Sequence, residues 1–334
     1  MTVPVIGLDI GGTKLAAALF GPDGEMVARQ RSASPAADGP AAVVAASAAL
    51  VNQLKAAAAR GPAVRRPAAL GVATAGVVDP SAGVIRSAGD TIMDWAGVRI
   101  GPLLEARTGL PTAVENDVNA MALAEASRGA ARGAESALVV AVGTGVGGAL
   151  VLGGALRRGP TGTAGEIGHL PVDVAADGPA AALCGCGRPG HLEALVAGPA
   201  IARRYAALTG CRTRPSLEDV SRACQDGDET ALAVIERAGT VLGRALGGLA
   251  NVIDPEVIVL AGGVLGVGRP FLDPMTAALR AETLPGPAGV AVHLSELGQD
   301  SGVIGAAIAA LGQVPGAPPA TRPRPGQGPK ETRR

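Results

Sequence analysis

Apolar runs interrupted by glycine-rich turns give the chain its first clear pattern. Residues 3–8 and 15–20 are almost wholly apolar, and the turn 9–14, Asp-Ile-Gly-Gly-Thr-Lys, separates them. Short apolar runs on either side of a glycine-rich turn predict two adjacent strands. A third strand is expected at residues 25–31, because the turn sequence Gly-Pro-Asp-Gly precedes it.

The same pattern returns about 130 residues further on. Residues 136–142 are mostly apolar, a turn with the sequence GTGVGG follows at 143–148, and residues 149–152 are apolar again. Because the two units share one layout, we expect two domains built on one plan.

Strand-like and helix-like segments alternate through the rest of the chain. Further buried strands are expected at residues 68–75, 111–114 and 254–260. A helix should begin within 115–119 and run to about 127, and the other helices are expected at residues 40–60, 103–108, 199–208, 217–224, 230–251 and 303–311. Such alternation predicts an α/β fold.

Composition adds limits on size and on function. With 334 residues, the chain exceeds the length over which a single core keeps growing, which favours two domains. Aromatic residues make up only 1% of the chain against 48% hydrophobic residues, so the cores must be built from alanine, valine, leucine and glycine. Basic and acidic residues balance at 29 each, which gives no electrostatic footprint for nucleic acid.

No signal peptide is evident at the start of the chain, and no uninterrupted apolar run reaches the length of about 20 residues that a membrane helix needs. Two of the four cysteines, Cys211 and Cys224, are unclustered and are expected to be ordinary thiols. This cysteine usage favours the reducing cytoplasm over a disulfide-linked secreted protein.

Two sets of polar residues adjoin the predicted strands. Asp9, at the end of a buried strand, could hold Mg²⁺ directly or through water, and the glycines after it allow a phosphate to approach the backbone. A plain β-hairpin is the alternative. Asn116 or Asp117 lies at a predicted helix N-terminus, either as a cap or, for Asp117, as a carboxylate base kept ionised by the helix dipole.

Residues 161–197 concentrate the ligand chemistry of the chain. His169, Cys184, Cys186 and His191 offer four zinc ligands, and Glu166 and Glu193 bracket them in the sequence. Closely spaced cysteines at i and i+2 are poorly placed to form a disulfide, whereas a glycine-flanked loop can chelate a metal. The alternative is a glycine-rich surface loop with two reduced thiols and two histidines.

Taken together, seven motifs in this order resemble the motif set of the ROK family, which contains bacterial glucokinases, other sugar and amino-sugar kinases, and sugar-responsive repressors. They span residues 3–311 and read Asp9-Ile-Gly-Gly-Thr-Lys14, Glu115-Asn-Asp117, Gly143 to Gly148, Gly165-Glu-Ile-Gly-His169, Cys184-Gly-Cys-Gly187, Leu192-Glu193 and Ala261-Gly-Gly263. The resemblance implies an actin-like, ribonuclease-H-like α/β fold of two domains with an interdomain cleft for ATP and sugar. We expect an N-terminal domain of residues 1–116 with 302–312, a C-terminal domain of residues 117–301, and a disordered tail at 313–334.

The resemblance also implies a role for each motif. Asp117 would be the catalytic base facing the 6-hydroxyl of a sugar, and the sugar contacts would be Gly76, Asn116, Asp117, Glu166, His169 and Glu193. His169 would bind zinc through one ring nitrogen and the sugar through the other. A further set of residues would bind ATP and its Mg²⁺: Asp9, Gly11, Gly12, Thr13, Lys14, Gly143, Thr144, Gly145, Gly262 and Gly263.

Three positions depart from the family pattern. His191 stands where a third cysteine is usual, which predicts a Cys₂His₂ zinc site, and Ala75 replaces a proline before Gly76. Residues 91–94 lack the asparagine-leucine pair of the glucokinases in this family, and Trp95 beside them covers the sugar or packs in a core. This last departure counts against glucose, so the expected substrate is either glucose or an amino sugar such as N-acetylmannosamine or kanosamine. The expected phosphate donor is ATP in place of polyphosphate.

Two other classes of protein were weighed against a kinase. A ROK repressor would carry a winged-helix segment ahead of the first glycine turn, where eight residues precede Asp9. A sugar-binding regulator without kinase activity would not require Asp9, Asp117 and both glycine turns. We therefore expect a cytoplasmic enzyme, a homodimer by resemblance, with sugar and ATP as partners and neither nucleic acid nor membrane.

Overall fold

Two units make up the part of the chain that the structure, a computed structural model, describes: residues 1, 3–60, 66–89, 91–173, 183–211 and 213–314. By contacts between residues, one unit is Met1–Ser136 with Leu150–Gly162 and Gln299–Arg334, and the other is Ala137–Ala149 with Thr163–Gly298. The predicted tail lies outside the described residues from residue 315 onward.

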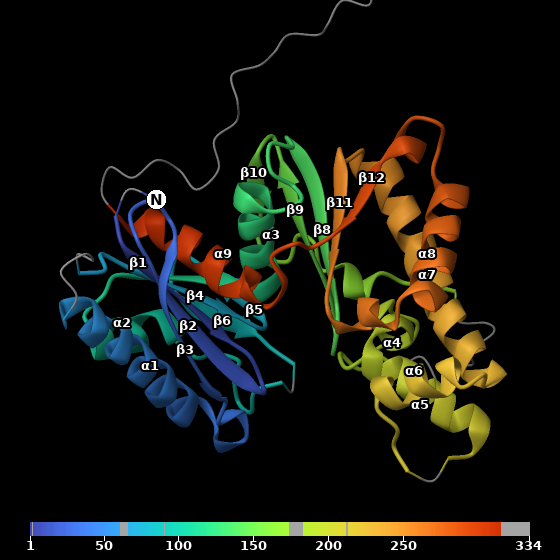
Figure 1. Cartoon of the computed structure of the whole chain (residues 1–334), viewed down its shortest axis with the longest axis horizontal. Coiled ribbons are helices and arrows are strands. Elements are labelled where there is room, and N and C mark those ends of the chain that lie inside the picture. The colour runs from blue at the N-terminus through green and yellow to red at the C-terminus, as the bar shows by residue number, and fades with distance from the viewer. Residues whose placement is uncertain (2, 61–65, 90, 174–182, 212, 315–334) are drawn as a thin grey trace, which may run out of the picture. The chain divides into compact units, whose positions relative to one another are not determined.

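The first unit is built on a five-stranded sheet with the order β3-β2-β1-β4-β7 (Figure 1). Strands β1, β2 and β3 form an antiparallel meander, and β4 and β7 add to β1 in parallel. The predicted strands are confirmed, with bounds Val5–Ile10, Lys14–Phe20, Met26–Ala33, Leu70–Thr74 and Thr112–Asn116 for β1, β2, β3, β4 and β7.

Alternating residues of this sheet face different helices, as the period of two in a strand requires. Ile6 and Leu8 join the core formed with helix α1 (Pro40–Arg60) and helix α2 (Ile100–Thr108). Gly7 and Gly71 face helix α9 (Ser301–Ala310) instead, and a Cβ on either would overlap the α9 backbone. Glycine at these two points therefore lets α9 lie directly on the sheet.

Helix α3 (Asp117–Arg128) belongs to the first unit by its contacts. It packs against α9 so closely that a Cβ on Gly305 would overlap the carbonyl group of Ala120. This packing is the reason why the unit boundary differs from the predicted boundary at residue 117. The return to the first unit, predicted at 302, occurs at Gln299.

The second sheet repeats the plan of the first, with the order β10-β9-β8-β11-β12. Strand β9 pairs antiparallel with β10, whereas β11 lies parallel to both β8 and β12. The bounds are Ser136–Val142, Val146–Leu152, Ala155–Arg157, Val257–Ala261 and Ala291–Leu294 for β8, β9, β10, β11 and β12. The match in strand order agrees with the repeated layout of the sequence.

Helices α7 and α8 lie side by side in the second unit (Figure 1). Gly239 and Gly243 of α7 leave no room for a Cβ, because the backbone of α8 at Phe271 and Met275 lies against them. Helix α8 contains a proline at position 274, and neither α8 nor β12 was predicted. The helix bounds are Glu193–Val196, Gly198–Thr209, Leu217–Gln225, Glu229–Ile253 and Arg269–Glu282 for α4, α5, α6, α7 and α8.

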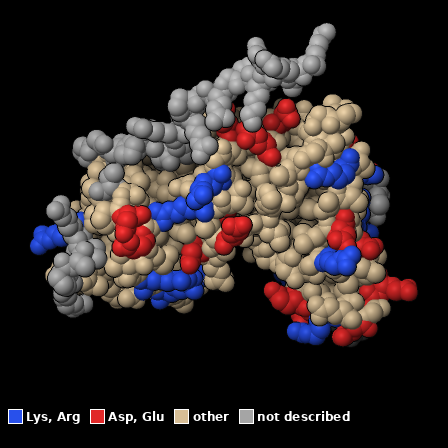
Figure 2. Space-filling model, turned by 45° about the horizontal axis from the view of Figure 1, so that its top comes forward, with Lys and Arg blue, Asp and Glu red and all other residues tan. Residues whose placement is uncertain are grey.

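Helix α1 is the one described helix that is long and apolar enough to cross a membrane, and part of it is buried against the first sheet. Trp95 is 1% exposed, belongs to the core of the first unit, and donates a hydrogen bond from Nε1 to Oγ1 of Thr74 at 3.0 Å. Its packing interpretation is therefore confirmed. On the face shown in Figure 2, acidic and basic side chains are interspersed.

Candidate functional site

The N-terminus of α3 carries the first candidate group. Asn116 is the N-cap, and its Oδ1 accepts hydrogen bonds from the N–H groups of Val118 at 2.9 Å and Asn119 at 3.0 Å. Its Nδ2 donates to the carbonyl oxygen of Gly76 at 3.1 Å. The cap interpretation of Asn116 is confirmed. Its side chain also hydrogen-bonds the Asp117 carboxylate.

Asp117 is the first residue of α3, as predicted. Its Oδ1 accepts a hydrogen bond from the N–H of Val118 at 2.9 Å. Burial raises the pKa of the Asp117 carboxyl, against the lowering effect of the hydrogen bonds from Val118 and Asn116. The hydrogen bonds at the helix terminus act in the expected direction, and the loss of hydration on burial is the larger, opposite effect.

Asp9 lies near the end of β1 and is electrostatically coupled to Asp117. Burial raises the pKa of Asp9 to about 6, and the negative charge of Asp117 adds to this effect. The positive charge of Lys14 acts in the opposite direction and lowers the pKa. A carboxylate whose ionisation is made more costly by a neighbouring carboxylate forms an arrangement that a divalent cation would relieve.

Gly302 is a contact of Asp9 that the sequence did not reveal. An added Cβ on this second residue of α9 would lie 2.7 Å from Oδ2 of Asp9. The two residues are nearly 300 positions apart, so no local spacing could have indicated the contact. Glycine at 302 therefore makes room for the Asp9 carboxylate beside the start of α9.

The two glycine turns use some of their own amides. The N–H of Gly11 donates to the carbonyl oxygen of Lys14 at 3.0 Å, and the N–H of Gly143 donates to the carbonyl oxygen of Gly145 at 2.9 Å. These two amides, predicted to face phosphates, therefore close their own hairpins. The side chains of Thr13, Lys14 and Thr144 are exposed.

Further glycines predicted to bind ligands have restricted backbones. Gly76 and Gly262 have φ angles of 101° and 106°, which side-chain-bearing residues rarely adopt. A Cβ on Gly262 would also overlap the backbone of Val142 at the end of β8. Gly263 follows within the same turn of the second unit, with its N at 4.0 Å from an ideal Cβ on Gly143.

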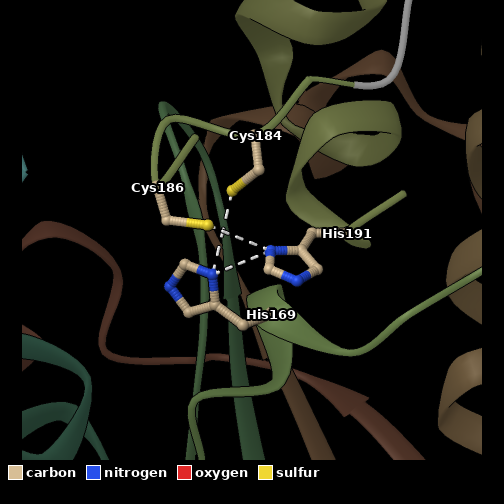
Figure 3. Close-up of side chains that lie close together, drawn as sticks. All are labelled: His169, Cys184, Cys186 and His191. Atoms are coloured by element: carbon tan, nitrogen blue, oxygen red, sulfur yellow. Dashed lines mark hydrogen bonds between the residues drawn. The ribbon is translucent and has the colours of Figure 1, made fainter. Parts of the chain in front are cut away.

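The predicted cysteine and histidine residues form one cluster in the second unit (Figure 3). The ligand atoms of His169, Cys184, Cys186 and His191 all lie within 4.8 Å of one another. The two Nδ1 atoms are 3.3 Å apart, Sγ of Cys184 is 3.8 Å from Nδ1 of His169, and Sγ of Cys186 is 3.2 Å from Nδ1 of His191.

These distances fit a tetrahedral metal site. Nitrogen and sulfur ligands bonded at about 2.0 to 2.3 Å to a tetrahedral centre lie about 3.3 to 3.8 Å from one another. Burial raises the pKa of the Cys184 thiol, so a bound cation would be needed to hold it as a thiolate. Both histidines present Nδ1 to the cluster, which leaves Nε2 of each free to point elsewhere.

The backbone around the cluster explains its shape. A tight turn closes with hydrogen bonds from Cys184 N–H to the Arg188 carbonyl and from Gly187 N–H to the Cys184 carbonyl, both 2.9 Å. Gly187 and Gly190 have φ angles of 83° and 76°, the left-handed region that glycine adopts readily. The predicted role of glycine in this turn is therefore seen at these two positions.

Glu193 connects the cluster to the second glycine turn. Its Oε1 lies 3.8 Å from Sγ of Cys184, and its Oε2 accepts a hydrogen bond from the N–H of Val146 at 2.9 Å. A Cβ on Gly145 would lie 2.7 Å from that same Oε2. Glu166 immediately precedes the short 3₁₀ helix Ile167–His169 that carries His169.

Comparison with known proteins agrees with this arrangement. The model of the ROK family matches residues 5–313. The glucokinase of Halalkalibacterium halodurans is 32% identical over 90% of this chain and 92% of its own length. The N-acetylmannosamine kinase of Escherichia fergusonii is 35% identical over 92% of this chain and 98% of its own length.

A solved structure shows the same fold. The crystal structure of a ROK family glucokinase from Streptomyces griseus, in complex with glucose and AMPPNP, superposes with a TM-score of 0.75 at 32% identity over 92% of this chain and 99% of that one. The predicted actin-like α/β fold is thus confirmed. With the family model matching nearly the whole chain, this protein belongs to the ROK family.

Proposed function

We propose that the protein is an ATP-dependent sugar kinase that phosphorylates the 6-hydroxyl of a hexose or amino hexose. The observation that carries this proposal is the half-buried Asp117 at the start of α3, in a chain whose relatives are sugar kinases. A sugar-binding regulator without catalysis is the alternative, and it would not consume ATP.

In this proposal, Asp117 takes the proton of the sugar hydroxyl as the oxygen of that hydroxyl bonds to the terminal phosphorus of ATP and the bond to ADP breaks. Oδ1 is held by the Val118 N–H, so Oδ2 is assigned to the hydroxyl. A carboxylate whose pKa is raised by burial is a stronger base than an exposed one. Phosphoryl transfer otherwise depends on position and charge neutralisation.

We assign the phosphates of ATP to the two glycine turns, through Gly12, Thr13, Lys14, Thr144 and Gly145, and the nucleoside to Gly262 and Gly263. Mg²⁺, when bound with ATP, would neutralise phosphate charge, and Asp9 is the carboxylate assigned to hold it, directly or through water. Relief of the electrostatic cost between Asp9 and Asp117 supports this assignment.

The Cys₂His₂ cluster is proposed to hold one structural zinc. Four ligand atoms with near-tetrahedral spacing support it. With Nδ1 of His169 directed to the metal, its Nε2 is assigned to a sugar hydroxyl. The other proposed sugar contacts are Glu166, Glu193, Gly76 and Asn116.

The sugar itself is proposed to be glucose or an amino sugar such as N-acetylmannosamine or kanosamine. Residues 91–94 carry no amide side chain, Ile92 is buried, and Met93 is 54% exposed. Of the two relatives named above, one is a glucokinase and the other an N-acetylmannosamine kinase, which supports both candidates. A homodimer in the cytoplasm remains a prediction.

The experiment that tests this function measures ATP consumption against a panel of hexoses and amino hexoses, with Asp117→Asn as the key variant. Removal of the base should lower kcat by about 10²- to 10⁴-fold while sugar binding, measured by calorimetry, is retained. Asp273→Asn, at a 58%-exposed carboxylate on α8, is the matched control and should keep full turnover. Undiminished turnover of Asp117→Asn would exclude it as the base.

A further inference from the structure

Glu115 is a buried carboxylate to which the proposed reaction gives no role. It is the residue before the N-cap Asn116, near the end of β7, and it is 2% exposed. An ionised carboxylate so far from water is costly unless its oxygens are matched by donors and by a positive charge.

Both oxygens of Glu115 have such partners. Oε2 accepts a hydrogen bond from Nε of Arg158 at 2.7 Å and forms an ion pair with Nη2 of Arg158 at 2.5 Å. Oε1 accepts from the backbone N–H of Asn116 at 3.2 Å and from Nδ2 of Asn119 at 3.0 Å. One oxygen thus holds the guanidinium, and the other holds the first turn of α3.

Arg158 reaches Glu115 because of where strand β10 lies. Helix α3 packs against β10, and Arg158 follows the last residue of that strand (Figure 1). Its neighbour Arg157 turns away, donating hydrogen bonds to the carbonyl oxygen of Leu152. Two consecutive arginines therefore have different partners.

We propose that Arg158 and Glu115 are positioning residues for Asp117, which rests on the proposed function in which Asp117 is the base. The guanidinium pairs with the Glu115 carboxylate and holds it in place, and that carboxylate fixes Asn116 and Asn119. Asn116 in turn caps α3 through the N–H groups of Val118 and Asn119. The direction of the Asp117 side chain depends on this chain of contacts.

Removal of the guanidinium leaves a buried carboxylate unpaired, and the first turn of α3 must shift or open to hydrate it. A displacement of about 1 Å at a reacting group can lower the rate by about 100-fold. The loss should appear in kcat more than in KM, because Arg158 is assigned no contact with either substrate.

The test compares Arg158→Met with Arg157→Met, a change of the same size at the adjacent arginine. We expect Arg158→Met to lower kcat by about 100-fold, with KM for ATP changed by less than about threefold, and Arg157→Met to leave both unchanged. Arg158→Lys should restore part of kcat, since lysine returns the charge but not the paired donors. Equal kcat values for the two methionine variants would overturn the proposal.

A measurement independent of turnover separates this proposal from the proposed function. Hydrogen exchange of the Val118 and Asn119 amides should be faster in Arg158→Met than in Arg157→Met, whether or not any sugar is phosphorylated. The double variant Glu115→Gln with Arg158→Met removes the unpaired charge and should slow this exchange again. Exchange at the rate of the unaltered protein in Arg158→Met would refute the positioning role, whereas lack of activity in the unaltered protein would refute only the kinase.

Discussion

Replacement of Asp9 by asparagine should stabilise the first unit above pH 6 while it removes activity. The pKa of Asp9 is about 6 in the folded protein, against an ordinary value of 3.8. A difference of about two pKa units corresponds to about 3 kcal/mol at 1.36 kcal/mol per unit. The unfolded chain ionises Asp9 near pH 4, so folding carries this cost fully above about pH 6.

The expected result has a definite pH dependence. Because the folded-state pKa is raised, the stability of the unaltered protein falls as pH rises through the interval between 3.8 and about 6. Asp9→Asn lacks that fall, so its unfolding free energy should exceed that of the unaltered protein by up to about 3 kcal/mol at pH 7.5. The excess should shrink towards zero near pH 4.

Urea unfolding followed by the fluorescence of Trp95 measures this effect in the relevant unit. Trp95 is the only tryptophan of the chain and lies in the core of the first unit. Asp79→Asn is a control in which the change in stability should have the opposite sign. A hydrogen bond from Ser81 lowers the pKa of Asp79, so the ionised carboxylate stabilises the fold, and its replacement should destabilise the unit at pH 7.5. If Asp9→Asn were less stable than the unaltered protein at pH 7.5, the burial of Asp9 would have been misjudged.

Two further predictions concern the metal cluster and the start of α9. Elemental analysis should find one zinc per chain, and His191→Ala should lower both zinc content and sugar affinity, whereas Cys211→Ala, at an exposed cysteine outside the cluster, should lower neither. Zinc retained in full by His191→Ala would contradict the Cys₂His₂ assignment. Gly302→Ala should raise the Mg²⁺ concentration needed for half-maximal activity by about tenfold or more, because the added Cβ displaces Asp9. Gly248→Ala, at a helical glycine with open space around it, is the control and should leave that concentration unchanged.

The sequence predicted most of the sheets, because apolar runs and glycine turns are local signals. It missed helix α8, whose prolines read as helix breakers. Pro270 lies in the first turn of α8, where a missing N–H costs little, and Pro274 is tolerated in a helix that packs closely on α7. Strand β12 was missed because it is four residues long and partly exposed.

The site was predicted where its signal was local and missed where its signal was distant. The four cluster residues lie within 22 positions of one another, and the structure brings them together. Arg158 lies 43 positions from Glu115, so no spacing rule could have paired them. The direction of the Asp117 pKa also depends on burial, which is a property of packing and not of the residues on either side.

The two five-stranded sheets share a strand order but differ in the residue that stands just before the glycine turn. Counting back two residues from the first glycine of each turn gives Asp9 in one copy and Ala141 in the other. The same scaffold position therefore holds a carboxylate once and a methyl group once. The two turns therefore obtain their acidic group in different ways: the first has Asp9 on its own strand, and the second has Glu193, which comes from helix α4.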